Sequence, residues 1–340
     1  MTIDIEQPGA LLTYLRSTGH LPPTIKPIIT PLAGGVSNRT MLVEFEDGSG
    51  WVVKQALAKL RVAVDWFSSP ERIHREALGL RWLAELVPAG SVPALLFEDE
   101  AHHIVAMRAV AQPHENWKVM LLGGTVNRTY VDAFGRLLAM IHRGAALRAA
   151  ELKPIFAEYS FFETLRLEAY YGYTASQVSD AARFLSALIE ETRSLRVTLV
   201  HGDFSPKNVL IHRARLVLLD HEVIHWGDPA FDLGFALTHL LSKARHLRAQ
   251  RQEFIEGAGW FWTAYRTALD LDLPWVPALE ARAVRHTLAC LLARVAGRSP
   301  LEYLSAQERQ EQQAAVIALM RTVPQTLPAL FERWNEALAG

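Results

Sequence analysis

The 340-residue chain lacks the features that mark several common classes of protein. It has one cysteine, so an internal disulfide framework is excluded and a reducing compartment is expected. No window approaches the roughly 18 to 20 uninterrupted apolar residues of a membrane span. The N-terminus has acidic residues before its apolar stretch, which argues against a signal peptide. The net charge is −1, so no overall positive charge attracts nucleic acid or a membrane surface.

We therefore expect a cytoplasmic protein with no nucleic-acid or membrane partner, either a monomer or a homodimer. The chain has no internal repeat and no low-complexity tract, and its length suffices for two lobes with a large core. Cys290 lies in the apolar run HTLACLLARV, which predicts a buried helix in which the thiol serves packing.

Ionisable and turn-forming residues are densest in residues 200–233, VHGDFSPKNVLIHRARLVLLDHEVIHWGDPAFDL. A strand over 195–200 is expected to end at this segment. The short apolar runs 209–211 and 216–219, separated by the polar residues 212–215, predict a tight hairpin.

Carboxylates and an amide follow these strands. Asp203 opens the loop after the first strand, Asn208 lies five residues later, and Asp220 closes the hairpin beside Glu222. The hairpin is expected to bring Asp220 toward the loop that carries Asp203 and Asn208. Such oxygen ligands suit Mg²⁺, particularly when phosphates supply the remaining ones. The alternative is that each aspartate merely caps a turn.

Protein kinases have the same spacing, in which an Asp is followed five residues later by an Asn and, after a hairpin, by a further Asp. With HGD(x4)N at residues 201–208 and D-H-E at 220–222, the chain resembles the aminoglycoside phosphotransferase and choline kinase superfamily. The resemblance implies an α+β, protein-kinase-like fold of two lobes. Residues 1–109 would form a nucleotide-binding lobe with a five-stranded antiparallel sheet and one helix, and residues 110–340 a mostly helical catalytic and substrate lobe.

The same resemblance implies ATP and Mg²⁺ as cofactors and assigns roles to the motif residues. Asp203 would take the proton of the acceptor hydroxyl, with His201 in the same motif, and Asp232 would organise the catalytic loop. The metal ligands would be Asn208 and Asp220, with Glu222 as an additional or water-mediated ligand.

The N-terminal part reads as a short helix over 9–18 followed by strands. A loop over 33–38 could let backbone N–H groups approach phosphate, although a Gly-Gly hairpin turn is a common alternative. Its candidate cofactor-binding residues are Gly34, Gly35, Ser37 and Asn38. The predicted strands cover 25–32, 40–45, 51–55, 94–97 and 103–107.

Lys54 lies in the predicted strand WVVKQA with apolar residues on its own face. The following helix, about 70–86, places Glu76 on an apolar stripe at three- and four-residue steps. A buried unpaired carboxylate would cost several kcal/mol. We therefore predict an ion pair between Lys54 and Glu76, which in kinases contacts the nucleotide phosphates. The alternative is a surface helix with Glu76 exposed and Lys54 at a sheet edge.

The run VKQALxxxR at residues 53–61 resembles methylthioribose kinase, a sugar kinase of this superfamily. Lys59 and Arg61 would add positive charge near the nucleotide or lie solvated on a loop. Met107 begins the expected linker, where kinases bind adenine through the backbone. The chain departs from the methylthioribose kinase pattern at residues 108–109 and at Asn208, where those kinases carry serine.

Helical spacing dominates after residue 125, with apolar stripes that include one over Phe161, Leu165, Glu168 and Ala169. Further helices are expected near 236–246, 252–269 and 278–296. Trp226 is a candidate border of the substrate pocket. Arg294 resembles an arginine of methylthioribose kinases that reaches the sugar site, although the helix dipole also favours arginine there.

The sequence thus predicts an ATP-dependent phosphotransferase acting on a hydroxyl of a small molecule, a sugar or thiosugar such as a methylthioribose-like compound. The alternatives are an aminoglycoside, choline, ethanolamine or homoserine-type kinase. A non-catalytic nucleotide-binding regulator of the same fold is a further alternative, which the complete set of motif residues disfavours.

Overall fold

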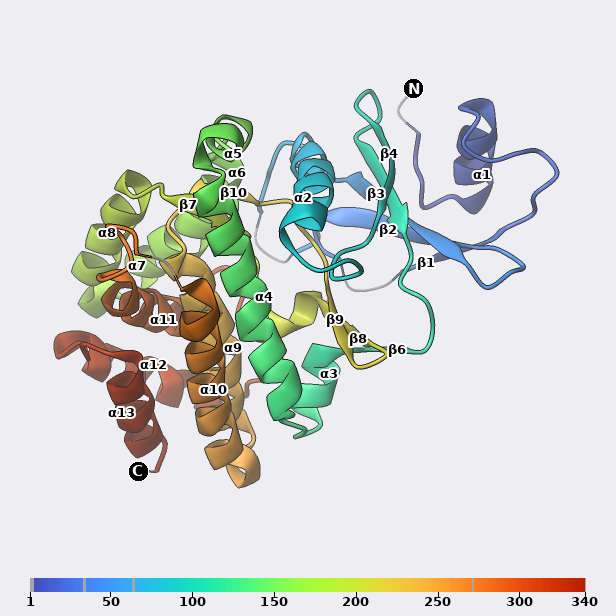
Figure 1. Ribbon diagram of the computed structural model, residues 1–340. Coiled ribbons are helices and arrows are strands. Elements are labelled where there is room, and N and C mark those ends of the chain that lie inside the picture. Colours follow the sequence, from blue (N-terminus) through green and yellow to red (C-terminus); the bar gives the residue numbers. More distant parts are fainter. Residues whose placement is uncertain (1–2, 33–34, 63–64, 271, 340) are drawn as a thin grey trace. The chain divides into compact units, whose positions relative to one another are not determined.

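The computed structural model describes residues 3–32, 35–62, 65–270 and 272–339. The chain forms two compact units (Figure 1). The first unit contains Met1–His114 and Val217–Glu222, and the second contains Glu115–Leu216 and Val223–Gly340. The predicted boundary lay after residue 109, so the short segment that returns to the first unit was not anticipated. This segment carries Asp220 and Glu222.

The first unit is built on a five-stranded antiparallel sheet in the order β1-β2-β3-β5-β4. Alternation along β3 gives the sheet two different faces, because successive side chains point to opposite sides. The predicted strands and the helices at 9–18 and 70–86 all form. Their bounds are α1 Pro8–Ser17, β1 Ile28–Pro31, β2 Asn38–Glu44, β3 Gly50–Ala56, α2 Arg72–Leu86, β4 Leu95–Asp99 and β5 Ile104–Arg108.

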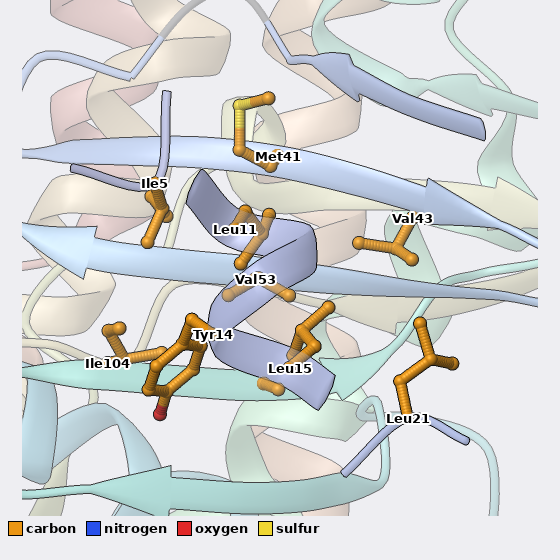
Figure 2. Packing of buried hydrophobic residues seen from close by; sticks show 10 residues of the cluster. Ile5, Leu11, Tyr14, Leu15, Leu21, Met41, Val43, Val53 and Ile104 are labelled. Atoms are coloured by element: carbon orange, nitrogen blue, oxygen red, sulfur yellow. The ribbon is translucent and has the colours of Figure 1, made fainter. Parts of the chain in front are cut away.

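Helix α1 covers one face of this sheet (Figure 2). Its side chains Leu11, Tyr14 and Leu15 pack against Val53 of β3 and Ile104 of β5, among other strand residues. Helix α2 covers the other face. Its buried residues Ile73, Ala77 and Leu80 pack with Ala56, Val105 and Met107. The sheet therefore has a helix on each face, and Lys54 shares the α2 face with Ala56.

The second unit is mostly helical. Helix α9 packs against α10 and α11, and α4 packs against α10. Strands β7 and β10 pair antiparallel, with Leu199 opposite Trp226. The elements from β6 onward are β6 His114–Asn116, α3 Trp117–Leu122, α4 Arg128–Leu147, α5 Ala149–Ile155, α6 Ser160–Phe162, π-helix η1 Glu163–Gly172, α7 Tyr173–Gln177, α8 Ser179–Ser194, β7 Thr198–Val200, 3₁₀ helix η2 Pro206–Asn208, β8 Val209–His212, β9 Arg215–Leu218, β10 His225–Gly227, α9 Ala230–His246, 3₁₀ helix η3 Arg248–Gln250, α10 Arg251–Leu269, α11 Leu279–Ala296, α12 Ala306–Arg321 and α13 Leu327–Ala339.

Three details bear on the predictions. The chain reverses between β8 and β9 at Arg213 and Ala214, whose φ angles of 47° and 59° suit a hairpin turn. Cys290 is buried in α11, and burial raises the pKa of its thiol to about 12, in keeping with a packing role. Glu168, which the helical stripe placed inward, is exposed instead, because η1 is a π-helix and does not keep the 3.6-residue period.

The fold class agrees with the prediction, with an antiparallel sheet in the first unit and a mostly helical second unit. Among the described residues, no helix combines the length and the apolar character that a membrane span requires.

Candidate active site

The first unit contains the ion pair that the sequence predicts. Lys54 Nζ lies 2.6 Å from Glu76 Oε1 and 3.1 Å from Asp220 Oδ1. Strand β3 directs the lysine toward α2, and the α2 stripe directs Glu76 back toward the sheet, where its side chain is fully buried. Asp220 reaches the pair from the segment 217–222, which belongs to the same unit. One cation is thus held between two carboxylates.

The pKa values of this pair reflect burial and charge. Burial opposes the positive charge on Lys54, but the nearby Asp220 and Glu76 outweigh it and raise the pKa of the ammonium group. Burial raises the pKa of Glu76 to about 7, although Lys54 acts in the opposite direction. Asp220 adds to the rise because like charges disfavour a second carboxylate.

Arg72 is a central residue of the first unit that the sequence reasoning missed. Its side chain is fully buried, and its Nε donates to Glu222 Oε2 at 3.1 Å. Its other nitrogens donate to backbone carbonyls, including those of Leu57 at 2.8 Å and Ser37. The sequence could have indicated that Arg72 is buried, because it lies four residues before Glu76 and therefore on the same stripe of α2.

The loop residues predicted to bind cofactor have structural partners. Gly34 lies outside the described residues. Gly35 precedes β2, and Ser37 Oγ accepts a hydrogen bond from Asn38 Nδ2 at 3.2 Å. The same amide nitrogen donates to Glu222 Oε2 at 3.2 Å. Glu222, a predicted metal ligand, thus has one carboxylate oxygen held by Asn38 and Arg72.

Met107 lies within β5 rather than in a linker. Its side chain is buried in the core between the sheet and α2, and its backbone position is opposite Val52. Two other positions of this unit were left open by the sequence. Lys59 forms an exposed ion pair with Asp65 at 2.7 Å, and Arg61 pairs with Glu6 at 2.7 Å.

In the second unit, Asp203 is held by two donors that meet the same carboxylate oxygen. Asn208 Nδ2 donates to Asp203 Oδ2 at 2.7 Å and to the Asp203 carbonyl at 3.0 Å. Arg166 NH2 lies 3.2 Å from Oδ2, and its Nε donates to the Gly202 carbonyl at 2.7 Å. The sequence did not predict Arg166. Within the described residues, no hydrogen bond reaches Oδ1, so this oxygen is available to a ligand.

The backbone before Asp203 is anchored by Asp232 of α9. The N–H groups of His201 and Gly202 donate to its two carboxylate oxygens at 2.7 and 2.8 Å. His142 Nε2 lies 3.2 Å from Oδ2 of the same carboxylate, and its Nδ1 is 2.8 Å from Tyr265 Oη. His142 is fully buried and is a partner of Asp232.

Burial acts to raise the pKa of Asp232, but the hydrogen bonds from His142 and Gly202 outweigh it, so that its pKa is lowered. Asp232 therefore stays ionised as the acceptor of the loop. The Asp203 N–H in turn donates to His201 Nδ1 at 3.2 Å, which places the proton of a neutral His201 ring on Nε2.

The two predicted substrate residues lie in different surroundings. Trp226 is 2% exposed, and its indole donates to the Arg196 carbonyl at 3.1 Å, which is a packing environment. Arg294 is 9% exposed and lies beside Tyr170, with NH1 3.3 Å from the phenol oxygen.

Metal binding rests on the chemistry of the available oxygens. The described part of the chain contains no group of three or more His, Cys, Asp or Glu side chains arranged for a metal ion. Fewer protein ligands suffice where phosphates complete the coordination of Mg²⁺. In the second unit, Asn208 uses its amide nitrogen on Asp203, which leaves its oxygen for a ligand. In the first unit, Glu76 Oε2 is buried without a hydrogen-bond partner among the described residues. Each of these oxygens, taken by itself, is of the kind that a hard cation prefers.

A pocket of about 530 Å³ occurs elsewhere in the first unit, lined by residues that include His20, Lys26 and Trp51. None of the predicted site residues lines it, so it has no place in the candidate site.

Comparison with known proteins identifies one family. Residues 28–271 match the sequence model of the phosphotransferase enzyme family. Methylthioribose kinase from Yersinia enterocolitica is 24% identical over 259 residues, which are 67% of this chain and 63% of that protein. The chain therefore spans less than two thirds of the length of that curated relative.

Two solved structures have a similar fold. Choline kinase from Cryptosporidium parvum Iowa II has a TM-score of 0.59 and 10% identity, covering 96% of this chain and 100% of that chain. Amicoumacin kinase, in complex with AMP-PNP, Ca²⁺ and Ami, has a TM-score of 0.57 and 19% identity, covering 93% of this chain and 94% of that chain. At these identities the likeness concerns the fold alone.

Proposed function

Because the chain belongs to the phosphotransferase enzyme family, we propose that it transfers a phosphoryl group from ATP to a hydroxyl group of a small molecule. The observation that carries this proposal is the hydrogen bonding of Asp203, whose Oδ2 is occupied by Asn208 and Arg166 while Oδ1 is available. A carboxylate held in this way has a fixed orientation and one oxygen that can accept a proton.

In the proposed reaction, Asp203 Oδ1 takes the proton of the acceptor hydroxyl. The hydroxyl oxygen forms a bond to the γ-phosphorus, the bond from that phosphorus to the bridging oxygen breaks, and ADP leaves. Asp232 keeps the loop in place through the N–H groups of His201 and Gly202. Phosphoryl transfer depends mainly on such positioning and on neutralisation of charge.

The first unit supplies the residues for the nucleotide. Lys54 is the phosphate ligand, and Glu76 and Asp220 hold its ammonium group. We assign nucleotide contacts to the backbone of the loop with Gly34 and Gly35, and to the chain that follows Met107. The other candidate cofactor residues, Ser37 and Asn38, follow in sequence, and Asn38 donates to Glu222.

Mg²⁺, when bound, would neutralise phosphate charge. Asn208 and Asp220 are the proposed ligands, and Glu222 would contribute through its oxygen that faces neither Arg72 nor Asn38. Three carboxylates and two cations meet around Lys54, and this negative excess is favourable for a divalent cation.

The acceptor in this proposal is a sugar or a thiosugar, as in the methylthioribose kinases that the chain matches. Trp226 and Arg294 are the proposed acceptor residues from the sequence, and Arg294 is the better supported because its side chain lies near the Arg166 and Asp203 pair through Tyr170. Kinases of aminoglycosides, choline, ethanolamine or homoserine remain the alternatives. We place the reaction in the cytoplasm, with a monomer or homodimer as its unit.

The experiment is a measurement of ATP consumption with Mg²⁺ against a panel of sugars, thiosugars, amino alcohols and aminoglycosides. With the best acceptor, Asp203→Asn should lower kcat at least about 100-fold, as expected for loss of a general base, and leave nucleotide binding intact. Asp180→Asn, at an exposed position, is the matched control. Retention of near wild-type turnover by Asp203→Asn would show that the base is assigned wrongly. Nucleotide binding without turnover of any compound would favour the non-catalytic regulator.

A further inference from the structure

Four basic side chains of the second unit are buried, and one of them, Arg166, contacts Asp203 of the catalytic loop. They come from three elements: Arg166 from η1, His239 and Lys243 from α9, and Arg294 from α11. Their exposed fractions are 7%, 4%, 0% and 9%. We refer to these four residues as the basic cluster.

Aromatic rings connect the basic cluster to the catalytic loop. The guanidinium groups of Arg166 and Arg294 lie 5.6 and 5.8 Å from the centre of the same Tyr170 ring. Arg166 also lies 5.9 Å from the ring of Phe235 and 3.2 Å from Asp203 Oδ2. The cluster therefore begins at the carboxylate that is the proposed base.

The rest of the basic cluster continues along α9. Phe235, His239 and Lys243 follow one another at four-residue steps, so they lie along one side of the helix. The rings of Phe235 and His239 are 5.3 Å apart. Arg294 of α11 is close enough to lower the pKa values of His239 and Lys243, so these three side chains belong to the same region of the unit. The spacing thus produces a row of basic groups beyond the catalytic loop.

Among the described residues, the buried cations of α9 and α11 in this row have no carboxylate in direct ion-pair contact, although Glu302 acts on the pKa of Lys243 from farther away. Lys243 Nζ donates to the His239 carbonyl at 3.2 Å and lies 5.2 Å from the Tyr303 ring. In the part of the chain that the structure describes, neither Lys243 nor Arg294 forms an ion pair with a carboxylate. The nearby Glu302 is 63% exposed and pairs with Lys118.

Two buried nitrogen atoms of the basic cluster also lack hydrogen-bond partners among the described residues. His239 Nε2 and Arg294 Nε are buried and have no hydrogen-bond partner among the described residues. Buried polar groups are nearly always hydrogen-bonded, and buried charges are nearly always paired. Burial, Lys118 and Arg294 lower the pKa of Lys243 to about 7, and burial and Lys243 lower that of His239. Arg294 NH1 already donates to the Ser299 carbonyl and, at 2.9 Å, to Ser299 Oγ. The groups that an anion would satisfy are therefore Arg294 Nε, the Lys243 ammonium group and His239 Nε2.

We infer that the acceptor of this enzyme carries an anionic group, a carboxylate or a phosphate, and that Arg294, Lys243 and His239 bind it while the acceptor hydroxyl meets Asp203. This inference rests on the proposed phosphotransferase function and narrows its substrate. Oxygen atoms of the anion supply the ion-pair partner that Lys243 and Arg294 lack and the hydrogen-bond partner that His239 Nε2 lacks. Arg166 remains the partner of Asp203.

The inference separates the candidate acceptors by charge. A sugar acid or a sugar phosphate satisfies the basic cluster, and so does the carboxylate of a homoserine-type acceptor. A neutral thiosugar leaves the buried cations unpaired. Choline, ethanolamine and aminoglycosides add positive charge to a region with a positive excess, which disfavours their binding.

Binding of ribonate, ribose 5-phosphate, ribose and choline to the full chain, measured by calorimetry in saturating Mg·AMP-PNP, tests the inference. Ribonate or ribose 5-phosphate should bind at least tenfold more tightly than ribose, and choline should not bind. Which of the two anions binds more tightly tells a carboxylate from a phosphate group. Arg294→Gln and Lys243→Met should each reduce this preference at least tenfold. Arg321→Gln removes the same charge from a side chain that is 72% exposed and should change it less than twofold.

Equal affinity for ribose and both anions would overturn the inference, as would a preference that survives in both cluster variants. If Mg·AMP-PNP does not bind, the proposed phosphotransferase function fails. The same titrations, repeated without nucleotide, then still show whether the basic cluster binds anions, so the two failures are distinguishable. Lys243→Met replaces a buried charge by an apolar side chain of similar length, and it keeps the test interpretable if Arg294→Gln does not fold.

Discussion

Lys243 gives a quantitative prediction, because the structure buries it completely without a carboxylate partner. Burial first, and then Lys118 and Arg294, lower its pKa from the ordinary 10.5 to about 7, although Glu302 raises it by more than Arg294 lowers it. His239, whose imidazole is also buried, adds no negative charge. We expect Lys243→Met to make the chain more stable at low pH.

The direction of this pH dependence follows from the pKa of Lys243 in the folded chain, about 7, and its ordinary value of 10.5. Below pH 7 the lysine is protonated in both the folded and the unfolded chain, and the folded chain bears the full cost of the buried charge. Between pH 7 and about 10.5 the folded chain releases the proton while the unfolded chain keeps it, so the stability of the wild type rises with pH. The gain from Lys243→Met is therefore largest below pH 7 and disappears as the pH approaches 10.5.

The magnitude follows from the same values. A change of one in pKa corresponds to ~1.4 kcal/mol, so the lowered pKa of Lys243 represents ~5 kcal/mol at low pH. Loss of the hydrogen bond to the His239 carbonyl offsets ~1 kcal/mol of the gain. We expect Lys243→Met to raise the free energy of unfolding by ~2–4 kcal/mol at pH 6 and by less than ~1 kcal/mol at pH 10.

Urea denaturation at pH 6, 8 and 10 at constant ionic strength measures this difference. Lys59→Met, at a side chain that is 57% exposed, serves as the matched control and should show little dependence on pH. A difference between Lys243→Met and wild type that is the same at all three pH values would refute the reasoning. Ribonate should stabilise the wild type at pH 6 more than it stabilises Lys243→Met.

Three further substitutions test the supports of the site. Asp232→Asn should lower the free energy of unfolding by ~2–4 kcal/mol and reduce turnover, because one amide cannot accept both loop N–H groups; urea melts and initial rates measure this. Arg72→Met should cost ~3–5 kcal/mol, because Glu222 loses its buried partner, whereas the exposed Arg81→Met should cost under ~0.5 kcal/mol in the same melts. Gly202→Ala should cost ~2–4 kcal/mol in a thermal or urea melt, because Gly202 has a φ of 78° and the added Cβ would lie 2.8 Å from a Val223 methyl group.

Much of the first unit could be predicted from the sequence, because its features depend on local periodicity. Alternation along WVVKQA places Lys54 on the apolar face, and the helical stripe places Glu76 opposite it. Each pattern would leave a buried charge alone, and their pairing removes both costs. The same rule applied to Arg72, four residues before Glu76, would have identified a third buried charge of this unit.

The second unit was harder to predict, because its key contacts join residues far apart in the chain. His142 and Asp232 lie 90 residues apart, and nothing near His142 in the sequence marks it as a partner of a carboxylate. Arg166 was missed for a different reason. It lies in the π-helix η1, where the 3.6-residue period fails, so the predicted stripe pointed Glu168 inward in its place.

The net charge of the whole chain does not reveal its local charge imbalances, which bear most on the ligands it can bind. The total of −1 averages two local imbalances of opposite sign. Around Lys54 in the first unit, carboxylates outnumber cations, which suits a nucleotide accompanied by a divalent cation. In the second unit, Arg166 and Arg294 lie over the Tyr170 ring, and Lys243 is buried near the Tyr303 ring without an ion-pair partner among the described residues, which suits an anionic acceptor. Each imbalance is costly while the charges are buried, and binding of a ligand of the opposite charge removes the cost. Selectivity for the acceptor therefore follows from what the described part of the second unit lacks, a carboxylate in an ion pair with Lys243.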